Sequence, residues 1–174
     1  MIRVATINDI RGLNQLIELS ARELSKEEYS YEEIEGAIRY VFGVDSELIA
    51  DQTYFVIEQE GFIVACGGWS KRKTLFGGNQ FDARERGYLD PQIDAAKVRA
   101  FFVHPSYARQ GLGAKLLQFC EQQAKMNGFS KIEMMATLPG VKLYRNYGYK
   151  INKLEITPLP NGVNLKFMRM SKIV

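Results

Sequence analysis

The sequence predicts an α/β fold in which a mixed sheet is flanked by helices. Residues 54–69 hold two runs of β-branched and aromatic residues around a Gln59-Glu60-Gly61 turn, the pattern of an antiparallel hairpin. Residues 97–136 run strand, helix, strand, which implies a right-handed parallel crossover. A chain that contains both kinds of connection needs a sheet of mixed strand direction.

Length and composition favour a single globular domain over residues 1–174. Hydrophobic residues make up 46% of the chain and charged residues 25%, the ordinary globular mix. No apolar run approaches the roughly 20 residues of a membrane helix, and the start of the chain lacks the apolar core of a signal peptide. A disordered, collagen-like or membrane-spanning chain is excluded, and we expect a cytoplasmic protein.

The first third of the chain predicts a short strand and two helices. Residues 2–5 alternate as a strand, and Thr6 with Asp9 resembles a capping box that opens a helix. Helical spacing marks the buried face of that helix at Ile10, Leu13, Leu16 and Ile17. A second helix is expected near 31–42, with Gly43 as its stop.

The remaining elements follow a long polar segment. Residues 71–94 carry many charges and little periodicity, so they predict a loop, and loops of this length in compact domains are usually functional or mobile. After it we expect a strand at 97–103, a helix at 112–126, a strand at 131–136, a short helix at 139–146 and a closing hairpin of strands 149–156 and 164–170.

Charge is distributed unevenly along the chain. Residues 18–60 carry twelve acidic and three basic side chains, whereas the whole chain has a net charge of +3. The asymmetry predicts either two surfaces with different ligands or simply solvated helix faces. The basic residues are spread over many elements without interleaved aromatics, so a nucleic-acid partner is not expected.

No metal site is predicted. Cys66 and Cys120 sit inside apolar segments, where a cysteine behaves as a small buried hydrophobe. Their spacing fits no metal motif, and the single histidine, His104, cannot complete a His cluster.

The segment from Val103 to Ala114 is the most informative part of the sequence. A strand runs into a turn that contains Gly111 and Gly113, and a helix follows. Glycines let the backbone approach a ligand, and a helix N-terminus attracts anions, so a pyrophosphate fits here, although such a turn can also be only a tight connection. The spacing matches neither a P-loop nor the dinucleotide fingerprint, which argues against an NTPase or a dehydrogenase.

Two motifs together resemble the GCN5-related N-acetyltransferase (GNAT) superfamily. Ala108-x-x-Gly111-x-Gly113 is similar to the Gln/Arg-x-x-Gly-x-Gly/Ala signature, and Leu143–Tyr149, "LYRNYGY", is similar to the family's "Y---GF" segment. The order of predicted elements matches the family over nearly the whole chain. The resemblance implies the GNAT fold, in which parallel strands splay apart at the centre of a mixed sheet.

The resemblance also implies acetyl-CoA as cosubstrate. Pyrophosphate would lie on the backbone amides of the glycine loop and pantetheine between the two splayed strands. The cofactor-binding residues implied are Phe101, Phe102, Val103, Ala108, Arg109, Gln110, Gly111, Leu112, Gly113 and Ala114. Ala108 departs from the Gln or Arg of the signature, which removes one side-chain contact that Arg109 can replace.

Two catalytic residues are expected by the same resemblance. Tyr144 matches the general acid that protonates the leaving thiolate; the alternative is a packing tyrosine. Glu133 approximates the glutamate of ribosomal-protein N-terminal acetyltransferases and is a candidate base; the alternative is a solvated strand-end glutamate, and Glu58 with a water chain is also open. Lys97 falls where histone-acetylating members carry a glutamate, which argues against a histone-type mechanism.

The function predicted is transfer of an acetyl group from acetyl-CoA to a primary amine by direct attack. The acceptor, a small molecule or a peptide amine, would bind between the first two helices and the closing hairpin, and the acidic segment favours a cationic amine. A non-catalytic acyl-CoA sensor on the same fold is the alternative. The resemblance leaves room for a homodimer.

Overall fold

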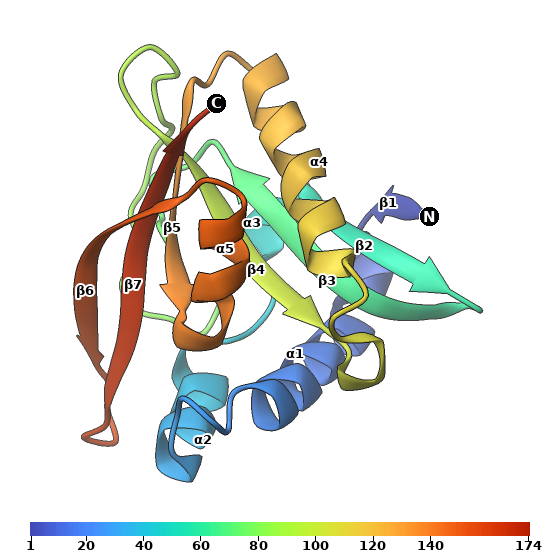
Figure 1. Cartoon of the computed structure of the whole chain (residues 1–174), viewed down its shortest axis with the longest axis vertical. Coiled ribbons are helices and arrows are strands. Elements are labelled where there is room, and N and C mark those ends of the chain that lie inside the picture. The colour runs from blue at the N-terminus through green and yellow to red at the C-terminus, as the bar shows by residue number, and fades with distance from the viewer.

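A computed structural model describes all residues from 1 to 174 and contains one mixed sheet of seven strands in the order β1-β2-β3-β4-β5-β7-β6 (Figure 1). All neighbouring strands are antiparallel except β4 and β5, which are parallel. The strands are β1 (Ile2–Val4), β2 (Tyr54–Gln59), β3 (Phe62–Ser70), β4 (Ala96–Val103), β5 (Lys131–Thr137), β6 (Lys150–Pro158) and β7 (Asn164–Ile173).

Helices cover both faces of the sheet, and each face has its own core. Figure 1 shows α1 and α2 apart from α4 and α5, with the sheet between them. Leu13 and Ile17 of α1 pack in one buried cluster, and Leu116 and Cys120 of α4 pack in the other. The helices are α1 (Ile10–Leu24), α2 (Tyr31–Tyr40), α3 (Ser46–Ala50), α4 (Leu112–Met126) and α5 (Val141–Asn146). None is long and apolar enough to cross a membrane.

The predicted fold class is confirmed, and the elements differ from the predictions only in detail. The second helix ends at Tyr40 rather than at the predicted 42. The short helix predicted at 139–146 begins as a 3-10 turn and becomes α-helical at Val141. The sequence did not predict α3, which begins after Asp45, whose carboxylate accepts a hydrogen bond from the backbone N–H of Glu47.

The segment 71–94 has little regular structure but is fixed to the sheet by arginines. Arg72 contacts the Asp51 carboxylate with N···O distances of 2.6 and 2.7 Å. Arg99 of β4 is buried and donates to the carbonyl oxygens of Thr74 and Gly77 at 3.1 and 2.7 Å. The part of this loop around Gly77 is therefore held against the centre of the sheet.

Candidate functional site

The parallel strands β4 and β5 meet only at one end. Their paired residues are Ala96 with Ile132 and Lys97 with Glu133, and beyond these the strands separate (Figure 1). Separated strands leave backbone groups without ladder partners, and such groups need another hydrogen-bond partner or solvent. Beyond these pairs β4 and β5 therefore form a fork, whose facing backbone groups are not used by the sheet.

A β-bulge at Ala100 shapes the side of this fork formed by β4. Ala100 has a φ of 53°, and the register opposite it shifts between Cys66 and Gly68 on β3. The wholly buried Tyr54 donates its hydroxyl to the Ala100 carbonyl at 3.1 Å. A bulge re-aims the residues that follow it, and here those residues border the fork.

The loop between β4 and α4 presents a row of free backbone N–H groups. The amides of residues 109–114 have no hydrogen-bond acceptor within the chain, and the first bond of the helix runs from Lys115 N–H to the Gly111 carbonyl. Arg109 and Gly111 both have left-handed backbone conformations, with φ of 60° and 80°. A Cβ at Gly111 would meet no atom within 4 Å, so the loop is open at this position. Converging free amides at a helix N-terminus can bind a phosphate group.

A groove runs from this loop to Tyr144. It is bordered by β4, by the loop and by α5, and Ser20, Ala21, Leu24 and Ser25 close it from α1 and its C-terminal end. The predicted cofactor residues in its lining are Phe101, Phe102, Val103, Ala108, Arg109 and Gly113. The groove joins the free amides to the fork, a layout that can hold an extended ligand with an anionic end.

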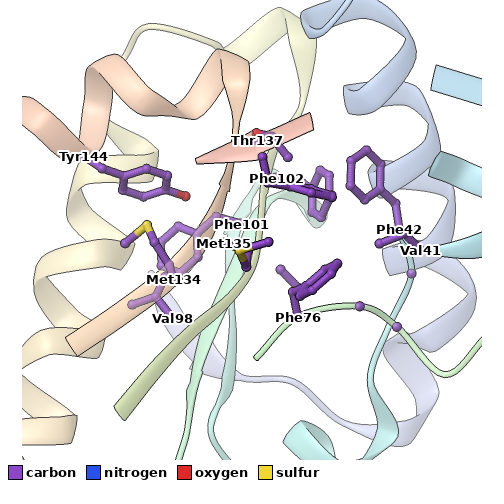
Figure 2. A pocket seen from close by; sticks show the side chains of 15 residues that line it. Val41, Phe42, Phe76, Val98, Phe101, Phe102, Met134, Met135, Thr137 and Tyr144 are labelled. Atoms are coloured by element: carbon purple, nitrogen blue, oxygen red, sulfur yellow. The ribbon is translucent and has the colours of Figure 1, made fainter. Parts of the chain in front are cut away.

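A second cavity lies against the groove at the fork and is lined almost entirely by apolar side chains. Its wall comes from the chain after α2, from the 71–94 loop, from both strands of the fork and from β7. Five residues line this cavity and the groove alike: Phe42, Phe101, Phe102, Thr137 and Tyr144. Figure 2 shows Tyr144 entering from one side, and Phe42 and Phe76 from the other.

Tyr144 lies where the groove and the cavity meet. Its side chain is 7% exposed, and its ring lies edge-on to Phe101 and to Tyr149, with centroids 6.5 and 6.0 Å away. Burial raises the pKa of the Tyr144 hydroxyl above its ordinary value. The group therefore stays protonated across the neutral range, and in Figure 2 its oxygen points into the cavity.

Glu133 is not among the residues that line the cavity or the groove. Its carboxylate is paired with Lys97 Nζ and with the Arg169 guanidinium, the latter at 3.2 Å. Burial would raise the pKa of Glu133, but its hydrogen bond with Lys97 and the charges of both cations outweigh it, so the pKa is lowered. The other candidate, Glu58, also lies elsewhere and pairs with Arg3 at 2.7 Å. The single histidine, His104, lines neither site, and its ring accepts a hydrogen bond from the Ser106 N–H.

Several site-lining residues were not predicted. Phe42 follows α2, Phe76 lies in the long loop, and Phe167 is on β7, so the cavity joins segments far apart in the sequence. Only the aromatic character of Phe76 beside Gly77-Gly78 signals a packing role for the loop.

Both cysteines are buried, and burial raises the pKa of the Cys66 thiol to about 12. No three His, Cys, Asp or Glu side chains cluster as metal ligands would.

The chain belongs to the acetyltransferase (GNAT) domain family, whose sequence model matches residues 50–151. This range contains β2 to α5, and with them the fork, the free amides and Tyr144. The GNAT membership expected from the two motifs is confirmed.

Known proteins of this kind resemble the chain at low identity. It is 25% identical over 173 residues to an amino-acid acetyltransferase from Mannheimia succiniciproducens, an alignment that covers 99% of this chain and 32% of that relative. The chain thus spans about a third of the length of its curated relatives. A GCN5-related N-acetyltransferase from Rhodopseudomonas palustris has a TM-score of 0.73 at 17% identity, covering 100% and 95% of the two chains. PaiA N-acetyltransferase from Thermoplasma acidophilum, in complex with coenzyme A, gives 0.66 at 16%, covering 100% and 98%.

Proposed function

We propose that residues 1–174 act as one acetyltransferase domain that transfers an acetyl group from acetyl-CoA to a primary amine. The observation that carries this proposal is the alignment of three features along one path: the free amides of 109–114, the groove, and the Tyr144 hydroxyl at the fork. The amides would bind the pyrophosphate, and the backbone of Phe101–Val103 would align the pantetheine. The coenzyme A complex of PaiA N-acetyltransferase supports the choice of ligand.

The proposed reaction is direct attack within the fork. The amine nitrogen forms a bond to the thioester carbonyl carbon, and the carbon–sulfur bond breaks as the tetrahedral intermediate collapses. The nitrogen loses one proton and the sulfur gains one. Tyr144 is protonated and faces the fork, so it is the group proposed to supply the proton to sulfur.

The amine must also lose a proton, and no side chain in the two linings is an ordinary general base. No Asp, Glu or His lines the cavity or the groove, and the ion pairs of Glu133 hold it as a carboxylate away from both. Glu133 stays a candidate that acts through water, but its contacts favour a role in holding β5 to β4 and β7. The missing base is the observation that favours the alternative function, an acyl-CoA sensor without turnover.

A thiol-release assay distinguishes the two functions. Acetyl-CoA is incubated with panels of amino acids, polyamines, aminoglycosides and peptides with free N-termini, and mass spectrometry identifies the acetylated product. We expect amine-dependent thiol release that saturates with one class of amine. Tight acetyl-CoA binding by calorimetry, with no acetylated product from any amine, would instead establish the sensor.

A further inference from the structure

The cavity beside the fork has the chemistry of a site for an apolar body. The centre of a water-sized sphere can occupy about 60 Å³ of it, which is room for a few water molecules. Its side chains are aromatic and aliphatic apart from two hydroxyls, those of Thr137 and Tyr144. No lysine, arginine, histidine or carboxylate side chain is in its lining. A ligand that fills it gains most from burying hydrocarbon.

The cations that hold the loop wall are already paired. Arg99 is 2% exposed at its side chain and contacts Asp45 at 2.8 Å in addition to two loop carbonyls. Arg84 contacts Asp45 at 2.8 Å and Glu47 at 3.0 Å. Neither guanidinium is free to receive a carboxylate from a ligand in the cavity.

The backbone oxygens of the same wall are used as well. The Gly77 carbonyl accepts from Arg99 and the Gly78 carbonyl from Arg84. The Phe42 carbonyl accepts from Gln80 Nε2 at 2.7 Å, and the Val41 carbonyl from the Gly78 N–H, also at 2.7 Å. These carbonyl oxygens are therefore already used, and a second ammonium on the ligand would find few free acceptors among them.

We infer that the acceptor is a primary monoamine on an apolar body, with no carboxylate beside the amine. The inference rests on the proposed function. The apolar body would lie against Phe42, Phe76 and Phe167, and the amine would face Tyr144 at the fork. A carboxylate carried into this cavity would lose its water without finding a cationic side chain to pair with. The chain would then differ from relatives named as amino-acid acetyltransferases, since an amino acid always brings a carboxylate.

The apolar wall also bears on how the amine becomes reactive. Only a neutral amine can attack a thioester, and burial in apolar surroundings lowers the pKa of an ammonium. A cavity of this kind helps deliver the neutral form even though no carboxylate or imidazole lines it. Aromatic faces can meanwhile tolerate the ammonium during entry.

The test compares amines that differ only in the carboxylate. We expect kcat/KM for 2-phenylethylamine to exceed that for phenylalanine by at least about 100-fold, because an unpaired buried ion costs several kcal/mol. Hexylamine should likewise exceed 1,6-diaminohexane, which carries a second ammonium. Phenylalanine within tenfold of 2-phenylethylamine, or glutamate as the best substrate, would overturn the inference while leaving the transferase function intact.

A binding measurement decides the inference if no amine is acetylated. Calorimetry with the CoA-saturated protein should detect binding of 2-phenylethylamine and not of phenylalanine. That result would keep the inference although the proposed transfer had failed; equal binding of both, or of neither, would overturn it.

Variants test whether this cavity is the site. Phe76→Ala should raise KM for 2-phenylethylamine at least about tenfold and leave KM for acetyl-CoA unchanged, because it removes one apolar wall. Phe76→Leu, which keeps apolar bulk, should retain the preference over phenylalanine. Phe62→Ala is the matched control, since Phe62 is 72% exposed at the far hairpin and lines neither cavity nor groove. An unchanged KM in Phe76→Ala would place the acceptor elsewhere and overturn the inference.

Discussion

The two sides of the β4–β5 fork are built in different ways. The groove side depends on backbone, with free amides from 109 to 114 set by two left-handed residues in one short loop. The cavity side depends on side chains that come from the chain after α2, from the long loop and from β7. A site made of backbone tolerates many side-chain changes, whereas a site made of side chains changes with each of them. Ligand binding on the two sides should therefore respond to different variants.

The largest expected effect comes from a charge placed in the amide row. Gly111→Asp puts a side chain and a negative charge on the open face of the loop, in a left-handed conformation that favours glycine. We expect acetyl-CoA binding, measured by calorimetry, to be lost while the circular dichroism spectrum is retained. Gly61→Asp is the matched control, because Gly61 has a φ of 81° and equally open surroundings. Unchanged affinity in Gly111→Asp would remove the pyrophosphate site from this loop.

The next effect separates chemistry from packing at Tyr144. Tyr144→Phe keeps the ring and removes the hydroxyl that faces the fork, so acetyl-CoA affinity should change little. The single-turnover rate should fall by about 10²–10⁴-fold, the usual contribution of a general acid. Tyr149→Phe is the control, because it removes a neighbouring buried hydroxyl that has no hydrogen-bond partner. The centroids of the Tyr149 and Tyr144 rings lie 6.0 Å apart. A wild-type rate in Tyr144→Phe would leave Tyr144 as a packing residue.

A third variant tests the ion pairs behind the cavity wall. Asp45→Asn leaves the buried Arg99 without its counter-ion, so the free energy of unfolding should fall by about 3–5 kcal/mol in urea titrations. Burial would raise the pKa of Asp45, but Arg99 and Arg84 outweigh it, and the pKa is lowered. The stabilisation is therefore complete at neutral pH and is lost as the pH falls through the folded-state pKa. The variant and the wild type should converge at acid pH, below the lowered folded-state pKa of Asp45, and a constant difference would contradict this account.

The smallest effect on rate is expected at Glu133. Glu133→Gln keeps the shape of the side chain but weakens its bonds to Lys97 and Arg169, so unfolding should become easier by about 1.5–3 kcal/mol. The single-turnover rate should change less than about tenfold, because the carboxylate lines neither side of the fork. A loss of about 10²-fold or more, with a shifted pH–rate profile, would establish Glu133 as the base.

Local patterns in the sequence predicted most of the fold. Apolar spacing at Leu13, Leu16 and Ile17 marked the buried face of α1, and all three are buried. The glycine spacing after Val103 predicted where the free amides lie, because a left-handed turn before a helix depends on only a few neighbouring residues. The parallel crossover followed from the length of the strand–helix–strand unit.

Long-range contacts were not predictable in the same way. The five-residue helix α3 is too short to show a helical period. The ion pair of Arg99 and Asp45 joins residues 54 positions apart, and the local sequence around either residue does not predict its partner. The cavity beside the fork depends on such contacts throughout. The sequence therefore predicted which elements border the acceptor site but not the apolar side chains that line the cavity.

The bulge at Ala100 reverses the alternation of β4 side chains between the two faces of the sheet halfway along the strand. Ala96 and Val98 belong to the core beneath α4, and so do Phe101 and Val103, although an unbroken strand would turn those last two toward α1. One added residue thus divides the strand into two halves with different contacts. The first half is ion-paired and holds the loop, and the second half is aromatic and borders the fork. Deletion of residue 100 would turn the side chains of the following strand residues to the opposite face of the sheet. This strand should therefore accept substitutions far more readily than any change in its length.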